Sequence, residues 1–172
     1  KGPVLLDIPF NIQGSDVEFR KWNNYLPNII DNGISNIEEL IKKSKRPVIL
    51  AGHGIKLSNS VELFRDVIKE LQIPTLLTWS GIDILSEDNC LYYGRPGIYG
   101  QRSANFIIQK ADLLIVLGSR LTLPQTGYNL NEFVRDGKIV MVDVDETENK
   151  DFVDIFIKTD CKIFLKKIKN IK

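Results

Sequence analysis

The stretch Val48–Ile55, with the sequence VILAGHGI, decides the fold class of this chain. Its first four residues are apolar, its two glycines flank the only histidine of the chain, and a helix-like segment follows. A short apolar run that ends in glycine and leads into a helix is typical of a strand–turn–helix unit. The stretch therefore predicts a buried strand over Val48–Ala51 and a tight turn at Gly52–Gly54.

Strands and helices are predicted to alternate along the rest of the chain. We expect strands at Val4–Asp7, Thr75–Thr78, Asp112–Leu117, Lys138–Val144 and Ile155–Lys158. We expect helices within Asn36–Lys43, over Gln101–Lys110, near Asn131–Arg135 and from Asp160 onward. A further helix should follow the N-cap candidates Ser58 and Asn59, of which Asn59 has the spacing of a capping box with Glu62. Such alternation produces right-handed crossovers and a parallel sheet. The predicted fold is α/β, with three layers, helices on both faces of a parallel sheet, and a Rossmann-like nucleotide-binding topology.

The composition favours one globular domain without a charged partner. The chain has 172 residues, of which 43% are hydrophobic, and its 23 basic residues nearly balance its 22 acidic ones. This balance gives no basis for a nucleic-acid or membrane partner. Cys90 and Cys161 lie far apart in the sequence, which favours a reducing compartment, the cytoplasm, over a disulfide framework or zinc site. The opening KGPVLLDIPF has no initiator methionine, so we expect a piece of a longer protein.

Four loops with candidate binding residues follow the predicted strands: Gly52–Gly54, Thr78–Gly81, Gly118–Arg120 and Asp143–Asp145. Open α/β sheets bind their ligands at the carboxyl ends of the strands, where these loops would lie together. A further loop, Trp79–Gly100, is long enough to be functional or to be ordered by a partner.

The Gly52-His53-Gly54 turn matches only part of a dinucleotide-binding fingerprint. The pattern G-x-G-x-x-G requires a third glycine where this chain has Leu57. Two interpretations remain open: a turn that approaches a ligand closely, and a turn that only needs glycine for a positive φ. His53 has no partner motif for general-base catalysis, and a turn residue in contact with a ligand is the simpler interpretation.

Charged residues at the strand ends are compatible with a nucleotide. Arg95, Arg102 and Arg120 could pair with a diphosphate or form structural ion pairs. Asp143 and Asp145 could accept hydrogen bonds from a ribose or cap the next segment. We expect these two carboxylates to point to opposite faces of the sheet rather than to form a catalytic pair.

Five segments together resemble one enzyme group. GPVLLDIPFNIQ is similar to the exit from the first catalytic domain of thiamine-diphosphate-dependent enzymes of the acetolactate synthase and pyruvate oxidase group. RPVILAGHGI, IPTLLTWSGID, GIYGQRSANFIIQKADLLIVLGSRL and KIVMVDVDETE resemble, in the right order, the central domain of the same group. GSRLTLPQTG resembles acetolactate synthase large subunits most closely.

The resemblance implies residues 1–32 as the exit strand of a preceding domain with a linker, and residues 33–172 as a central domain with a sheet of about six strands. The parent enzyme would decarboxylate a 2-keto acid such as pyruvate and transfer the two-carbon unit, in branched-chain amino acid biosynthesis. Its missing N- and C-terminal domains would hold thiamine diphosphate and Mg²⁺. The parent would be a dimer or tetramer, and the fragment alone would be inactive. The alternative is a non-catalytic nucleotide-binding module with a regulatory or interaction role.

The resemblance also implies a FAD or ADP site in this domain, with no catalytic or metal-binding residue. The implied contacts are Gly52, His53, Gly54, Thr78, Trp79, Gly97, Ile98, Tyr99, Gly100, Gly118, Ser119, Arg120, Asp143 and Asp145. Trp79 and Tyr99 depart from the family, because small or flexible residues are common at those positions.

Overall fold

The computed structural model describes residues 5–16, 18, 36–146, 151–169 and 171, and the strands and helices alternate within them. The strands are β1 (Pro47–Ala51), β2 (Thr75–Leu77), β3 (Leu113–Leu117), β4 (Lys138–Asp143) and β5 (Ile155–Lys158). The helices are α1 (Phe10–Gln13), α2 (Ile37–Lys43), α3 (Gly54–Leu57), α4 (Val61–Leu71), α5 (Arg102–Lys110), α6 (Leu123–Thr126) and α7 (Cys161–Ile168). Two short 3-10 helices, η2 (Trp79–Gly81) and η3 (Leu130–Glu132), complete the set.

The five strands form one parallel sheet in the order β2-β1-β3-β4-β5. A sixth strand was expected, and within the described residues only a single parallel bridge between Thr75 and Tyr92 takes its place at the outer edge of β2. The Thr75 amide donates to the Leu91 carbonyl at 2.8 Å, and the Tyr93 amide donates to the Thr75 carbonyl at 2.9 Å. If this bridge is counted as the third strand, the order becomes 3-2-1-4-5-6, the order of dinucleotide-binding domains. The predicted Rossmann-like topology is therefore confirmed.

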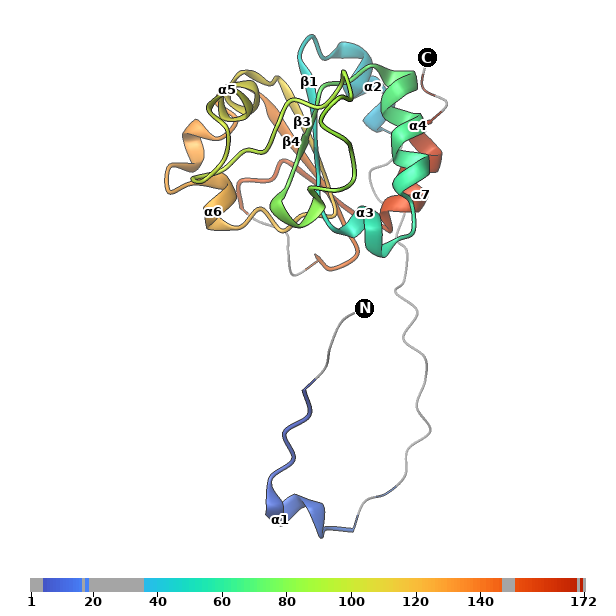
Figure 1. Cartoon of the computed structure of the whole chain (residues 1–172), viewed down its shortest axis with the longest axis vertical. Coiled ribbons are helices and arrows are strands. Elements are labelled where there is room, and N and C mark those ends of the chain that lie inside the picture. The colour runs from blue at the N-terminus through green and yellow to red at the C-terminus, as the bar shows by residue number, and fades with distance from the viewer. Residues whose placement is uncertain (1–4, 17, 19–35, 147–150, 170, 172) are drawn as a thin grey trace.

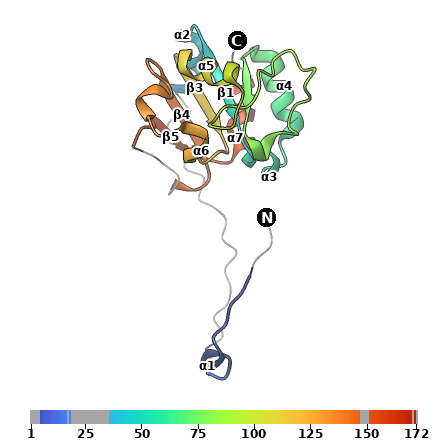
Figure 2. The same ribbon diagram turned by 60° about the vertical axis from the view of Figure 1, so that its left-hand side comes forward.

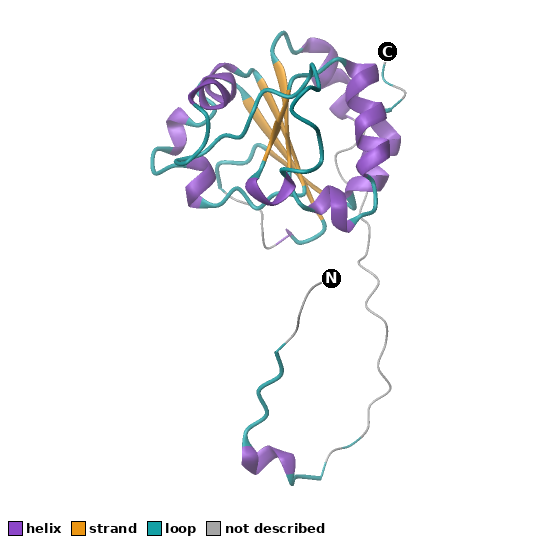
Figure 3. Cartoon of the chain, viewed as in Figure 1, coloured by secondary structure: helices purple, strands orange, loops and turns teal. Residues whose placement is uncertain are grey.

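Helices cover both faces of the sheet, as predicted (Figure 1, Figure 3). Alternate strand residues such as Ile49, Ile115 and Val142 pack with α4 and α7 in one core cluster. Their neighbours, such as Leu50 and Val116, pack in a second cluster with residues of α5 and of the segment that follows β3. β3 is buried along its whole length because it is central and covered on both faces. β5 lies beside β4 at the edge of the sheet (Figure 2).

The helix after the first turn begins differently from the prediction. Its N-cap is Ser60 rather than Asn59, and no side chain caps it. The Ser60 hydroxyl donates instead to the Ile55 carbonyl at 3.1 Å, and Asn59 has a positive φ of 50°. The predicted capping box of Asn59 and Glu62 is therefore wrong, because a separate short helix, α3, occupies the preceding residues and ends in this tight turn.

The N-terminal segment is only partly described. Residues 5–7 form no strand, and α1 follows them, so the predicted strand is wrong for these residues. Leu5 and Phe10 are 93% and 90% exposed. The predicted linker and the boundary between residues 32 and 33 lie mostly outside the described residues.

A carboxylate fixes the entry to β1 at the edge of the sheet opposite the strand-end loops. Asp112, which precedes β3, accepts hydrogen bonds from the Lys45 amide at 2.8 Å, from the Arg46 amide at 3.0 Å, and from the Ser44 hydroxyl. Arg46 Nε donates in turn to the Lys110 carbonyl at 2.7 Å. Burial would raise the pKa of Asp112, but the hydrogen bonds from Ser44 and the two amides outweigh it and hold the pKa below its usual value. The turn between α2 and β1 is thereby tied to the start of β3.

Candidate functional site

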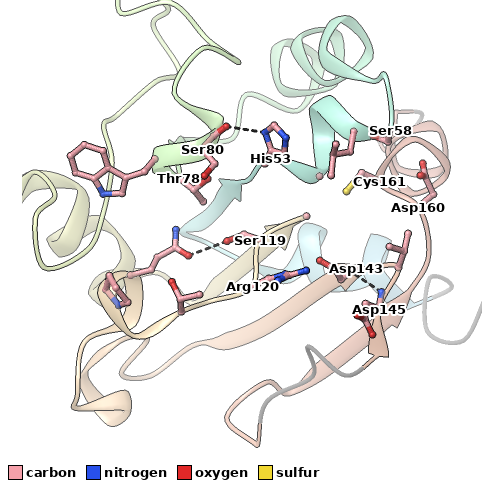
Figure 4. A pocket seen from close by; sticks show the side chains of 18 residues that line it. His53, Ser58, Thr78, Ser80, Ser119, Arg120, Asp143, Asp145, Asp160 and Cys161 are labelled. Atoms are coloured by element: carbon pink, nitrogen blue, oxygen red, sulfur yellow. Dashed lines mark hydrogen bonds between the residues drawn. The ribbon is translucent and has the colours of Figure 1, made fainter. Parts of the chain in front are cut away.

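A cleft of about 600 Å³ lies at the carboxyl ends of β1, β2, β3 and β4 (Figure 4). It lies at the point where the strand order reverses between β1 and β3, which is where this topology places ligands. Its volume is within the range of about 300–1,000 Å³ found for small-molecule sites. The lining residues are His53, Gly54, Leu57, Ser58, Thr78, Trp79, Ser80, Gly118, Ser119, Arg120, Thr122, Pro124, Gln125, Asp143, Val144, Asp145, Asp160 and Cys161.

Nine of the predicted contact residues meet in this cleft. They come from all four strand-end loops and are His53, Gly54, Thr78, Trp79, Gly118, Ser119, Arg120, Asp143 and Asp145. The parallel sheet brings them together because all its strands end at the same edge.

The two glycines of the first turn allow its backbone to contact the backbone at Gly118. A Cβ atom added to Gly54 would lie 2.6 Å from the Gly118 Cα, and one added to Gly52 would lie 2.3 Å from the Gly118 carbonyl oxygen. The Gly54 amide donates to that oxygen at 3.0 Å and is therefore not available to a phosphate. Of these three glycines only Gly118 has a positive φ, 58°. The positive-φ interpretation of Gly52 and Gly54 is therefore wrong, because these glycines are needed where the turns after β1 and β3 meet. Close approach of Gly54 to a ligand stays a prediction.

His53 connects two of the loops around the cleft. Its Nδ1 lies 3.1 Å from the Ser80 carbonyl oxygen. A carbonyl only accepts hydrogen bonds, so Nδ1 is the donor in this contact. Beside this bond, Lys56 Nζ contacts both carboxylate oxygens of Asp83 at 2.9 and 2.8 Å. This contact is the main cause that holds the pKa of Asp83 below its usual value. The two interactions hold α3 against the η2 loop.

The loop after β3 forms the central wall of the cleft. Leu121, one of three non-glycine residues with a positive φ among those described, has a φ of 46° and buries its side chain to 3% exposure. The Ser119 hydroxyl donates to Gln125 Oε1 at 3.0 Å, which ties the start of this loop to α6. Arg120 lies in the sequence between Ser119 and Leu121, and it lines the cleft.

One end of the cleft is acidic. Asp143 and Asp145 both line it, and the Asp145 amide donates to Asp143 Oδ1 at 3.1 Å. The prediction that they point to opposite faces is wrong in its premise, because residues two apart on a strand lie on the same face, and β4 in any case ends at Asp143. Asp160 caps α7 by accepting from the Lys162 amide at 2.7 Å. Burial raises the pKa of the neighbouring Cys161 thiol to about 12, and the charges of Asp160 and Asp143 add to this effect. Cys161 is therefore a neutral, small lining residue at physiological pH.

The polar residues are thus divided along the cleft. Figure 4 shows Asp143, Asp145 and Asp160 on one side and Thr78 and Ser80 on the other, with Ser119 and Arg120 between them. Among the described lining residues, Arg120 is the only lysine or arginine.

Five predicted residues do not line this cleft. Gly52 is buried behind it. Gly97 and Ile98 line a second hollow of about 310 Å³ between α5 and α6. Gly100 packs on the Arg95 carbonyl, and Tyr99 is 79% exposed. These last four belong to one loop, residues 97–100.

Asn105 accounts for the position of this loop. Its amide donates to the Gly97 carbonyl at 3.0 Å, and its carbonyl accepts from the Gly97 amide at 2.8 Å. The Ile98 amide also donates to the Pro124 carbonyl at 2.8 Å. The loop is therefore attached to α5 and α6.

Sequence reasoning missed half of the lining residues: Leu57, Ser58, Ser80, Thr122, Pro124, Gln125, Val144, Asp160 and Cys161. For Asp160 and Cys161 a signal existed, because they follow the predicted strand Ile155–Lys158 and strand ends were already the basis of the prediction. Ser58 and Gln125 gave none, since short helices that periodicity does not detect bring them to the cleft.

The described residues contain no group of three histidine, cysteine or acidic residues placed to hold a metal ion. None of their helices has the length and apolar character needed to cross a membrane.

Most of this chain is similar in sequence to known proteins. Residues 34–168 match the family model described as thiamine pyrophosphate enzyme, central domain. The acetolactate synthase isozyme 2 large subunit of Escherichia coli (strain K12) is 29% identical over 150 residues, which cover 86% of this chain and 27% of that protein. The probable acetolactate synthase large subunit of Methanococcus aeolicus is 32% identical over 179 residues, which cover 97% of this chain and 30% of that protein. The isozyme 1 large subunit of Escherichia coli (strain K12) is 33% identical over 152 residues, covering 86% of this chain and 26% of that protein. The chain thus spans less than a third of the length of these relatives.

Proposed function

Because the chain belongs to the thiamine pyrophosphate enzyme central-domain family, we propose that it is the nucleotide-binding central domain of an acetolactate synthase-like enzyme. Its cleft would hold FAD or ADP. The observation that supports this proposal is the convergence of nine implied contact residues on one cleft at the switch point of the sheet.

The charges of the cleft fit a nucleotide in one orientation. Three carboxylates, Asp143, Asp145 and Asp160, line one end and would repel a diphosphate, but carboxylates accept hydrogen bonds from ribose hydroxyls. Arg120 lies between the carboxylates and the Thr78 side of the cleft (Figure 4) and would pair with the phosphate oxygens. The glycines Gly54 and Gly118 leave this part of the wall without side chains. The adenosine sugar would therefore lie at the acidic end and the diphosphate beside Arg120.

A thermal-shift experiment tests nucleotide binding. A ligand that binds only the native state, at 100 times its Kd, stabilises it by about 2.7 kcal/mol, which corresponds to a rise in Tm of about 5–10 °C for a chain of this size. We expect FAD or ADP to produce such a rise in the 172-residue chain. Arg120→Ala should reduce it at the same ligand concentration.

Arg102→Ala is the matched control. Arg102 stacks on Phe106, with its Cζ 5.4 Å from the ring centroid, and it does not line the cleft. Its replacement should leave the ligand-induced shift unchanged. A chain whose Tm does not respond to either nucleotide at millimolar concentration would contradict the proposed site.

The proposed activity belongs to the longer parent protein. Thiamine diphosphate would supply the carbanion chemistry that decarboxylates a 2-keto acid and transfers its two-carbon unit. This chain's residues would form the nucleotide site and contacts with the flanking domains, in a homodimer or homotetramer. Both cysteines are free, which fits a reducing compartment, and we propose the cytoplasm.

Activity assays of the natural full-length protein test this part. With thiamine diphosphate, Mg²⁺ and pyruvate, it should form acetolactate, whereas the 172-residue chain should form none. A natural protein that has no catalytic domains beside this one would instead support the non-catalytic binding module.

A further inference from the structure

Trp79 lines the cleft and lies in the chain between Thr78 and Ser80, which Figure 4 shows on the side opposite the carboxylates. It starts η2, directly after Thr78 at the end of β2, and its side chain is 53% exposed although it lines the cleft. An indole that is half exposed at the edge of a cavity has ring surface available for a ligand. Base–aromatic stacking is one of the strongest uses of such a surface.

Arg95 covers part of the same ring. Its Cζ lies 5.2 Å from the Trp79 ring centroid, within the distance of a cation–π contact. Arg95 is itself held in place, because its Nη1 lies 3.5 Å from the Tyr92 hydroxyl and its backbone amide donates to Gln101 Oε1. The neighbouring Gly94 carbonyl accepts from the Leu77 amide of β2 at 3.0 Å. The indole is thus fixed from one side before any ligand arrives, which lowers the entropy cost of stacking on it.

The division of the cleft then indicates what kind of ligand reaches Trp79. A ligand whose first sugar lies at the acidic end and whose diphosphate lies beside Arg120 must extend past the diphosphate to reach the indole. We propose that Trp79 is a stacking platform, so that the cleft selects a dinucleotide with a planar ring system at its second end, such as FAD, over ligands that stop at the second sugar or at the diphosphate. This inference rests on the proposed nucleotide site.

Calorimetric titration of the full chain with FAD and with ADP-ribose measures this preference. ADP-ribose keeps the adenosine, the diphosphate and a second sugar, but it has no ring system to stack. We expect FAD to bind more tightly by about 5- to 150-fold, the factor that corresponds to one stacked ring. Trp79→Leu keeps an apolar side chain but no ring, and it should abolish the preference. Trp79→Phe should retain part of it.

Tyr99→Leu is the matched control, because Tyr99 is an exposed aromatic residue that does not line the cleft. It should leave both affinities unchanged. Fluorescence gives a second readout: in a Trp22→Phe background Trp79 is the only tryptophan, and its emission should fall when FAD binds. The melting temperatures of the variants without ligand show whether each one folds.

The outcomes separate this inference from the proposed function. Equal affinities for FAD and ADP-ribose, or a preference for FAD that survives in folded Trp79→Leu, would overturn the stacking platform and leave the nucleotide site intact. No binding of either ligand to the folded chain would overturn both proposals.

Discussion

At the scale of single residues, the contact between Gly54 and Gly118 leaves no room for a side chain on either residue. A Cβ atom on Gly118 would lie 2.5 Å from the Gly54 Cα, and backbone atoms cannot move aside as a flexible side chain can. The two strand-end turns therefore form one joined rim of the cleft.

Gly54→Ala tests this contact. Because Gly54 does not have a positive φ, the cost of alanine there comes from crowding alone, and we expect a loss of about 1–3 kcal/mol in the free energy of unfolding. Gly14→Ala is the control, since a Cβ atom at Gly14 would meet nothing within 4 Å. Urea denaturation of both variants measures the difference. A Gly54→Ala chain as stable as Gly14→Ala would contradict the crowded contact.

Leu121 combines an unfavourable backbone conformation with a buried side chain. Its φ of 46° favours glycine, while its side chain packs in the core beside α5. Leu121→Ala should lower the free energy of unfolding by about 2–4 kcal/mol, because it removes the buried side chain and keeps the backbone strain. Leu121→Gly removes both, so it should be at least as stable as Leu121→Ala, the reverse of the usual order. Denaturation that finds the glycine variant clearly less stable would refute the strain at this position.

At the scale of elements, the turn between α2 and β1 depends on Asp112. Asp112→Asn keeps the shape of the side chain but loses the charge that accepts hydrogen bonds from two backbone amides and a hydroxyl. We expect a loss of about 1–3 kcal/mol in the free energy of unfolding at pH 7. Asp88→Asn, an exposed carboxylate in the long loop, is the control and should cost less.

The effect of Asp112 should also depend on pH. Its pKa is lower in the folded state than the value of about 3.9 for an unfolded chain, so the folded state binds the proton less readily. The stabilisation by the carboxylate is therefore complete above about pH 4 and is lost as the pH falls further, through the folded-state pKa. The difference in stability between wild type and Asp112→Asn should be constant from pH 7 to pH 5 and should shrink toward pH 3. A difference that does not change with pH would contradict the charge as its cause.

The regular elements of the central sheet were predictable because their sequence signal is local. β1, β3 and β4 are apolar runs, and α4 and α5 repeat apolar residues at helical spacing, so each appears within a short window. The sixth position of the sheet was not predictable from local pattern. Leu91–Gly94 pairs with β2 through three backbone hydrogen bonds, and its run of Leu91, Tyr92 and Tyr93 is too short to be told from a loop by pattern alone.

The site was predictable to the extent that strand ends define it. Gly118 and Asp143 were found because each follows an apolar run, whereas Ser80 and Gln125 depend on the path of a loop that the sequence does not encode locally. Residues 97–100 were expected in the cleft by resemblance, but the hydrogen bonds of Asn105 attach their loop to α5. Contacts of this kind depend on tertiary structure and cannot be read from spacing.

At the scale of the whole molecule, the order in which the cleft residues appear along the chain has a consequence for synthesis. The cleft is lined by residues from His53 to Cys161, and its acidic end includes Asp160, the N-cap of α7. A nascent chain that has emerged only through β4 could pair its central strands, yet one wall of the cleft would still be inside the ribosome. Ligand capture would then be among the last steps of folding, so a bound nucleotide would mark chains that have completed this domain.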